Sequence, residues 1–148
     1  MREKFASNVT RCLLQVFSGA YHQAYDCMSI STQLGTTMNA NEAYERGRRE
    51  MESGRLEKAI EAFDEATSLT PSSFDSWWAL ASACNLFGTL LEGEGDYKRA
   101  NMYKVKAAYS FDRATRAESS NPKAEKAKAY AQTIRDAQAK KKELGYFE

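Results

Sequence analysis

Two ten-residue stretches of the chain share one pattern of apolar and polar positions. Residues 58–67 have the sequence KAIEAFDEAT, and residues 106–115 have the sequence KAAYSFDRAT. In each, an alanine, a phenylalanine and a second alanine are spaced four and three positions apart, which predicts one buried face of an α-helix. The recurring positions are Lys58, Ala59, Phe63, Asp64, Ala66 and Thr67 in the first stretch, and Lys106, Ala107, Phe111, Asp112, Ala114 and Thr115 in the second. Such repetition indicates stacked units that share a continuous core.

A further helix pattern precedes each stretch. Before the first stretch, Ala43 and Gly47 stand four positions apart, and Pro71 follows the stretch. Before the second stretch stand Trp77 and Leu80, and Trp77 lies 34 positions after Ala43. This arrangement resembles the tetratricopeptide repeat, whose 34-residue unit has Trp, Leu-Gly and Tyr in its first helix and Ala and Phe in its second, before a Pro.

The resemblance covers a little over half of the chain. It implies two repeats, over residues 39–72 and 73–120, in an all-α fold. That fold is a right-handed α–α superhelix of antiparallel helix hairpins, with capping helices at its N- and C-terminal ends.

The second repeat is longer than the first. Phe63 and Phe111 lie 48 rather than 34 positions apart, so 14 residues are inserted within the second repeat. At 3.6 residues per turn the insertion adds about four turns, or about two to each helix of one hairpin. We therefore expect long helices over residues 73–91 and 96–119, joined by a turn at residues 92–95.

Residues 1–38 do not align with the repeat pattern. Their apolar residues begin with a helical stripe made of Phe5, Val9, Cys12, Leu13, Val16 and Phe17. We predict that this segment is a helical hairpin or capping segment that hides the apolar edge of the first repeat. The alternative is that the segment lies in the binding groove and competes with a partner.

Residues 121–148 predict a C-terminal helix and a short tail. Asn121 suits the N-cap of this helix and Pro122 suits its first helical position. The apolar stripe is sparse and consists of Ala127, Tyr130, Ala131, Ile134, Ala137 and Leu144. A polar helix of this kind is typical of the solvating helix that closes a helical-repeat array.

Charge, cysteine content and hydropathy indicate the cellular compartment in which the protein acts. The net charge is +1, so no overall field favours nucleic acid or a membrane surface as a partner. The three cysteines, Cys12, Cys27 and Cys84, form no close pair, and an odd number argues against a disulfide framework. The chain has no apolar run of about 18 residues, so we expect no membrane span. These features favour a cytoplasmic protein.

Motifs for catalysis are missing from the sequence. The only histidine is His22, and no phosphate-binding loop or nucleophile motif accompanies it. Glu92, Glu94 and Asp96 stand close together, but their spacing does not match a calcium loop, which favours a solvated turn. Cys84 fits the core better than it fits a nucleophile. We therefore predict that the protein is not an enzyme and has no cofactor and no metal site.

The resemblance implies a concave binding groove lined by the first helix of each repeat. Its positions fall on Asn41, Tyr44, Arg48, Met51, Glu52, Asp75, Trp78, Ser82 and Asn85. The aromatic pair Tyr44 and Trp78 beside Arg48 and Asn85 has the composition of a binding hot spot. The alternative for Trp78 is packing under the N-terminal segment or the last helix. Family members that grip an acidic peptide end use Lys and Asn at sites that hold Tyr44, Arg48 and Ala79 here, so this chain departs from the chaperone-tail pattern.

These features favour a non-catalytic module that binds a protein or peptide partner, as an adaptor, co-chaperone or scaffold. Two alternatives stay open. One is a homodimer formed through Met102, Val105 and Tyr109 on the elongated hairpin. The other is binding of an anionic ligand, RNA or lipid, by the lysines of the C-terminal segment: Lys123, Lys126, Lys128 and Lys140 to Lys142.

Overall fold

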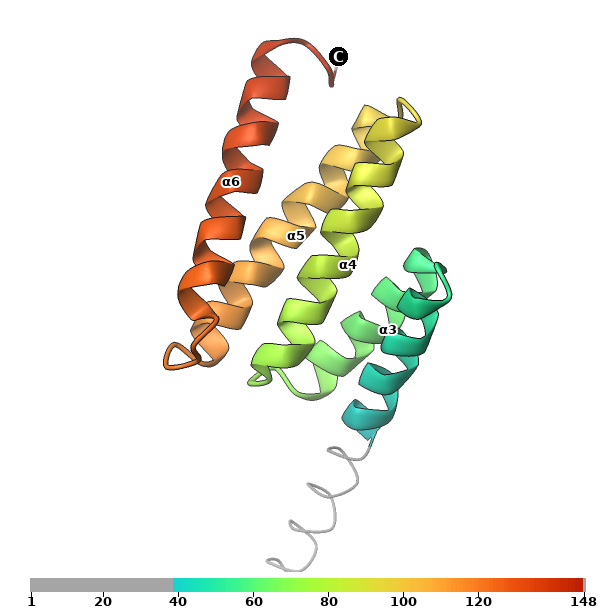
Figure 1. The fold of residues 1–148 in the computed structure, drawn as a ribbon, viewed down its shortest axis with the longest axis vertical. Coiled ribbons are helices and arrows are strands. Elements are labelled where there is room, and N and C mark those ends of the chain that lie inside the picture. The colour runs from blue at the N-terminus through green and yellow to red at the C-terminus, as the bar shows by residue number, and fades with distance from the viewer. Residues whose placement is uncertain (1–38, 148) are drawn as a thin grey trace, which may run out of the picture. The chain divides into compact units, whose positions relative to one another are not determined.

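The computed structural model describes residues 39–147, and every regular element in this range is an α-helix. The predicted segment over residues 1–38, with His22, Cys12 and Cys27, lies outside the described residues. The helices cover residues 39–52, then α3 (Leu56–Leu69), α4 (Phe74–Gly93), α5 (Tyr97–Ala117) and α6 (Ala124–Glu143). They pack in chain order as antiparallel hairpins, with α4 between α3 and α5, and α5 against α6 (Figure 1). The predicted all-α helical-repeat fold is confirmed.

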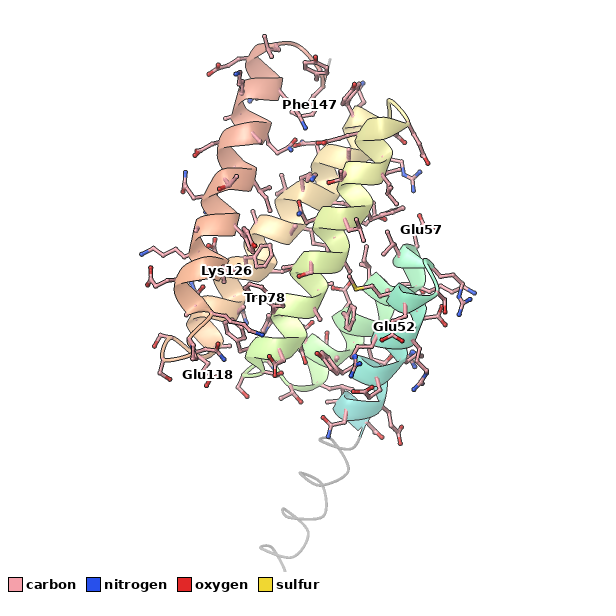
Figure 2. The ribbon with its side chains drawn as sticks, viewed as in Figure 1. Glu52, Glu57, Trp78, Glu118, Lys126 and Phe147 are labelled. Atoms are coloured by element: carbon pink, nitrogen blue, oxygen red, sulfur yellow. The ribbon has the colours of Figure 1, made fainter. Side chains whose placement is uncertain are left out.

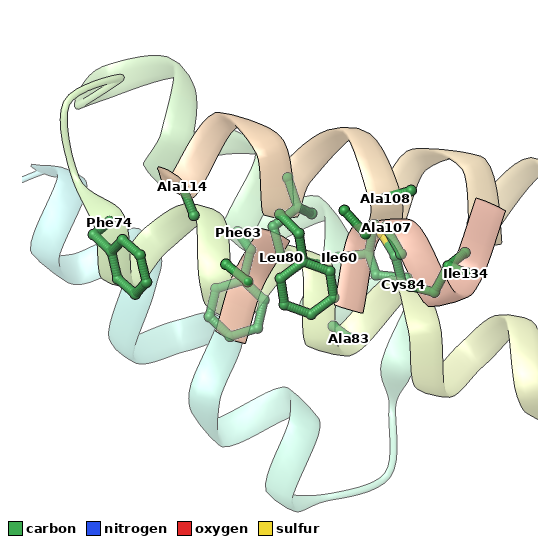
Figure 3. Packing of buried hydrophobic residues seen from close by; sticks show 14 of the residues in the cluster. Ile60, Phe63, Phe74, Leu80, Ala83, Cys84, Ala107, Ala108, Ala114 and Ile134 are labelled. Atoms are coloured by element: carbon green, nitrogen blue, oxygen red, sulfur yellow. The ribbon is translucent and has the colours of Figure 1, made fainter. Parts of the chain in front are cut away.

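The repeated alanines and phenylalanines are buried in the core, and Figure 3 labels Phe63, Ala107 and Ala114 among them. Ala59, Phe63 and Ala66 in α3, and their counterparts Ala107, Phe111 and Ala114 in α5, are each at most 3% exposed. Small side chains let neighbouring backbones approach, and the phenylalanine rings fill the remaining space. Five of these six residues, all except Ala66, belong to one core cluster, which also includes Leu80, Ala81 and Cys84 from α4 and Ala127, Ala131 and Ile134 from α6.

The repeated aspartate of α3 forms an ion pair with the second helix that follows it, and the repeated aspartate of α5 forms one with the next helix. Asp64 of α3 forms an ion pair with Lys106 of α5, and Asp112 of α5 forms one with Arg135 of α6. All four side chains are partly exposed to solvent, so each pair stabilises the fold by at most about 1 kcal/mol. Each copy of the repeated aspartate therefore contributes an ion pair to a helix later in the chain.

The second hairpin is elongated, as the insertion predicts. α4 and α5 have 20 and 21 residues, whereas α3 has 14. In Figure 1 they extend past the turn that joins the helix over residues 39–52 to α3. The Ser73 hydroxyl accepts a hydrogen bond from the Ser76 N–H, and the Asp96 carboxylate accepts one from the Arg99 N–H. These two N-caps fix where α4 and α5 begin. α4 ends two residues later than expected, and α5 ends two residues earlier.

The start of α6 differs from the prediction. Asn121 is not its N-cap and Pro122 is not its first residue, because the first helical residue is Ala124. The Asn121 side-chain oxygen accepts a hydrogen bond from the Lys123 N–H at 3.0 Å, and the Asn121 carbonyl accepts one from the Ala124 N–H at 2.9 Å. The Asn121 side chain therefore stabilises a turn before the helix, a role that asparagine commonly has in loops, and does not cap the helix itself.

The buried stripe of α6 also differs in part from the prediction. Its buried residues are Ala124, Ala127, Ala131, Ile134 and Gln138. Tyr130, Ala137 and Leu144 were expected in this stripe but are exposed. Three of the five buried residues are alanines, whose small side chains allow α6 to approach α5 closely.

Candidate functional site

Five of the predicted groove residues lie on the helix over residues 39–52: Asn41, Tyr44, Arg48, Met51 and Glu52. Tyr44 and Met51 are half-buried and pack against the core, whereas the other three are exposed. The Tyr44 ring contacts that of Phe63, with 5.7 Å between the ring centroids. Arg48 has carboxylates on either side, at 3.4 Å from Glu45 and 3.6 Å from Glu52. Exposed pairs of this kind are weak, so Arg48 can exchange them for a partner's carboxylate.

The hydroxyl of Tyr44, on the helix over residues 39–52, is influenced by a carboxylate on α4. Burial raises the pKa of its hydroxyl above the ordinary value, and the Asp75 carboxylate raises it further, while Arg48 acts in the opposite direction. The hydroxyl therefore stays protonated at neutral pH and can donate a hydrogen bond. Because Asp75 lies on α4, its carboxylate acts on Tyr44 across the boundary between the two helices.

Trp78 packs against α6 and is still partly exposed. Its ring centroid lies 5.3 Å from that of Phe111, 5.8 Å from that of Phe74 and 5.9 Å from that of Tyr130 on α6. The Lys123 ammonium lies 5.8 Å from the same ring. Figure 2 shows Trp78 between α4 and α6. The side chain thus has a structural role in holding α6 and also keeps surface that a partner can contact.

The two remaining groove residues make contacts within the fold. The Ser82 hydroxyl donates to the Trp78 carbonyl at 2.9 Å. Asn85 accepts a hydrogen bond from the Lys104 ammonium at 2.9 Å, and Thr89 accepts another from Lys104 at 2.6 Å. Lys104 belongs to the buried face of α5, where burial lowers its pKa and the Glu92 carboxylate partly opposes that shift. Asn85 therefore satisfies a buried lysine instead of pointing freely to solvent.

A polar cluster joins α4 to α6 beyond Asn85. The Glu92 carboxylate forms an ion pair with Lys141 and accepts a hydrogen bond from the Gln138 side-chain amide at 3.4 Å. Burial raises the pKa of Glu92, but the hydrogen bond from Lys141 and nearby lysine charges lower it more, so the net pKa lies below the ordinary value. The Gln138 Oε1 atom is buried and has no partner among the described residues. Glu92 therefore does not lie in a solvated turn, contrary to the prediction.

Other groups considered for chemistry are engaged in the fold. Cys84 is fully buried, and burial raises the pKa of its thiol to about 12, so it is a core residue as predicted. Within residues 39–147, no three His, Cys, Asp or Glu side chains converge in a way that would hold a metal ion. None of the helices in that range is both long and apolar enough to cross a lipid bilayer.

Tyr130, Lys123 and Lys126 lie near Trp78 but are not among the predicted groove residues, and the two lysines were predicted only as part of an anion-binding alternative. Tyr130 is 41% exposed and contacts Trp78, and the Lys126 ammonium lies 5.6 Å from the Tyr130 ring. Their spacing of three and four positions places them along one edge of a helix, which is a signal the sequence contains. They bring α6 into the same surface as Trp78.

Comparison with protein-family models matches residues 47–84 to the TPR repeat. The matched residues run from the helix over residues 39–52 through α3 and into α4. No curated protein and no solved structure matches the chain.

Proposed function

Because the chain contains a tetratricopeptide repeat, a unit that generally mediates protein–protein interaction, we propose that it is a non-catalytic module that binds a segment of a protein partner. The proposed binding surface is the inner face, which consists of the nine predicted groove residues: Asn41, Tyr44, Arg48, Met51, Glu52, Asp75, Trp78, Ser82 and Asn85. An adaptor, a co-chaperone and a scaffold would each use this surface in the same way. In this proposal the protein acts in the cytoplasm.

The observation that carries the proposal is the setting of Trp78. Three aromatic rings hold its side chain from α4, α5 and α6, yet part of it stays exposed. A rigid, partly exposed tryptophan loses little conformational entropy on binding, and such residues dominate the energetics of many interfaces. Tyr44, Arg48 and Asp75 supply a hydroxyl and both signs of charge at the neighbouring end of the same face.

A charge reversal on the first helix tests the proposal. The partner is first isolated from native extract on the immobilised wild-type chain, and its affinity is then measured by titration calorimetry. Arg48→Glu should weaken that affinity about fivefold or more, a loss of about 1 kcal/mol. Arg49→Glu is the matched control, because it makes the same charge change on the next, exposed residue of the helix. Equal affinity for wild type and Arg48→Glu would remove the inner face from the proposal.

A second candidate function is self-association. Met102, Val105 and Tyr109 are 70%, 56% and 53% exposed, and their spacing places them on one side of α5. An exposed apolar row of this kind suits the interface of a homodimer. Sedimentation equilibrium over a dilution series tests the idea, with Val105→Glu expected to shift a dimer to monomer. A wild-type chain that stays monomeric at all concentrations excludes it.

A further inference from the structure

Two lysines at the start of α6 lie over aromatic rings: Lys123, immediately before the helix, and Lys126, in its first turn. The Lys123 ammonium lies 5.8 Å from the Trp78 ring, and the Lys126 ammonium lies 5.6 Å from the Tyr130 ring. The two rings contact each other at 5.9 Å. We name these four side chains the lysine–aromatic patch. Cation–π contact holds each ammonium over a ring without cancelling its charge, so both stay able to bind an anion.

No carboxylate neutralises these two lysines within the described part of the chain. None of the ion pairs among residues 39–147 involves Lys123 or Lys126. The acidic residues of α6 are Glu125, Asp136 and Glu143, and their spacing of 11 and 7 positions places them together on a different side of the helix. α6 therefore presents positive charge toward α4.

The facing surface of α4 lacks charge of its own. Between Asp75 and Glu92 its sequence contains only apolar, aromatic and neutral polar residues. Beneath it, Lys104 is bonded to two neutral acceptors, Asn85 and Thr89. The Glu92 carboxylate beyond them is already paired with Lys141. The strip between α4 and α6 therefore has more positive than negative charge along most of its length.

We infer that the partner segment is an acidic peptide that lies along α4, with its carboxylates against Lys123 and Lys126 and an apolar side chain on Trp78. This inference rests on the proposed function and adds the lysine–aromatic patch to the inner face. Charge complementarity of this kind sets both specificity and association rate.

RNA fits the same surface less well. A phosphate backbone needs a broad cationic face, because affinity grows with each phosphate that is neutralised. The side of α6 near α5 is mixed, since Asp112 and Glu125 stand there among Arg116, Lys128 and Arg135. The positive charge is thus confined to a narrow edge, which suits a single extended peptide.

Fluorescence anisotropy with two designed peptides tests the inference. One labelled probe alternates glutamate with leucine and tyrosine, and the other has lysine in place of every glutamate. The glutamate peptide should bind about tenfold more tightly than the lysine peptide, and its affinity should fall as salt is added. The double variant Lys123→Glu, Lys126→Glu should lose about tenfold or more of the glutamate-peptide affinity.

The matched control is the double variant Lys128→Glu, Lys142→Glu, which makes the same charge change at two other exposed sites of α6. Its affinity should stay within about twofold of wild type. The variant Lys123→Gln, Lys126→Gln should show an intermediate loss, and circular dichroism confirms that each variant is folded.

Three outcomes overturn the inference: equal binding of the two peptides, equal losses in both double variants, or tighter binding of a labelled RNA oligonucleotide than of the glutamate peptide. The affinity of the natural partner for each variant distinguishes failure of this inference from failure of the proposed function. If Arg48→Glu weakens the natural partner while Lys123→Glu, Lys126→Glu does not, the acidic-segment inference fails and the inner face stands. If neither variant weakens that partner, both fail.

Discussion

The ring of Phe63 lies directly against the backbone of Gly47. A Cβ atom placed on Gly47 would stand 2.6 Å from Cε1 and 2.7 Å from Cδ1 of that ring. The helix over residues 39–52 can therefore approach α3 this closely only because residue 47 has no side chain. Tyr44 contacts the same ring, so this approach also fixes one residue of the inner face.

Gly47→Ala should destabilise the protein. The added methyl group meets a fully buried ring, and such overpacking costs about 1 to 3 kcal/mol, against a gain of about 1 kcal/mol in helix propensity, so the net loss is up to about 2 kcal/mol. Urea unfolding measures the difference. Gly93→Ala is the control, because no atom beyond its chain neighbours and the backbone of its own helix lies within 4 Å of the added group, and it should leave stability equal or higher. Equal stability of Gly47→Ala and wild type would show that the helix over residues 39–52 can move away from α3 to accommodate the methyl group without a loss of stability.

The buried thiol of Cys84 should make the fold sensitive to high pH. Burial raises its pKa from 9.0 to about 12, so the native state holds the proton more tightly than the unfolded state does. This contribution to stability is complete below pH 9 and is lost as the pH rises toward 12, at about 1.4 kcal/mol per pH unit.

The test compares wild type with Cys84→Ala by urea unfolding near pH 8 and near pH 10. Between these two values wild type should lose about 1.4 kcal/mol more than the variant does. Effects of Tyr44 and Lys104, whose pKa values are also shifted, are common to both proteins and cancel in the difference. Parallel losses in the two proteins would mean that the thiol titrates normally in the folded state.

Gln138→Met should leave stability unchanged or raise it by up to about 1 kcal/mol, because a buried acceptor without a partner is removed. The variant gives up only a long hydrogen bond of 3.4 Å to Glu92. Thermal unfolding followed by circular dichroism is sufficient to measure the change. A loss above about 1 kcal/mol would indicate that the Gln138 oxygen has a partner, such as an ordered water.

Ala127→Leu should weaken the attachment of α6. Ala127 is fully buried, so a larger side chain there overpacks the contact at about 1 to 3 kcal/mol. Ala129→Leu, at an exposed position of the same helix, should change stability by less than about 0.5 kcal/mol. If both variants unfold at the same urea concentration, α6 is not closely packed against the hairpin.

The helices and their buried faces were predictable because they depend on local spacing. Ala59, Phe63 and Ala66 share one side of any α-helix, and their recurrence at Ala107, Phe111 and Ala114 marks a second unit. The long hairpin was predictable for the same reason, since an insertion of about whole turns preserves the buried side.

The pairings between helices were not predictable from spacing. Asn85 meets Lys104, and Glu92 meets Lys141, across 19 and 49 positions of sequence. Which polar groups meet depends on the axial position of each helix relative to its neighbour. The periodicity of apolar residues does not determine that position. The same limit applies to Trp78, whose contact with Tyr130 depends on the placement of α6.

The end of α6 and the residues after it contact the residues on either side of the turn between α4 and α5. Glu92 is held by Lys141, and the Tyr97 ring meets that of Tyr146, with centroids 4.8 Å apart. Release of α6 would therefore free the last turn of α4 and the first turn of α5 together, as one cooperative opening event. Hydrogen exchange of the amides in the last turn of α4 should then report the same opening free energy as exchange in α6.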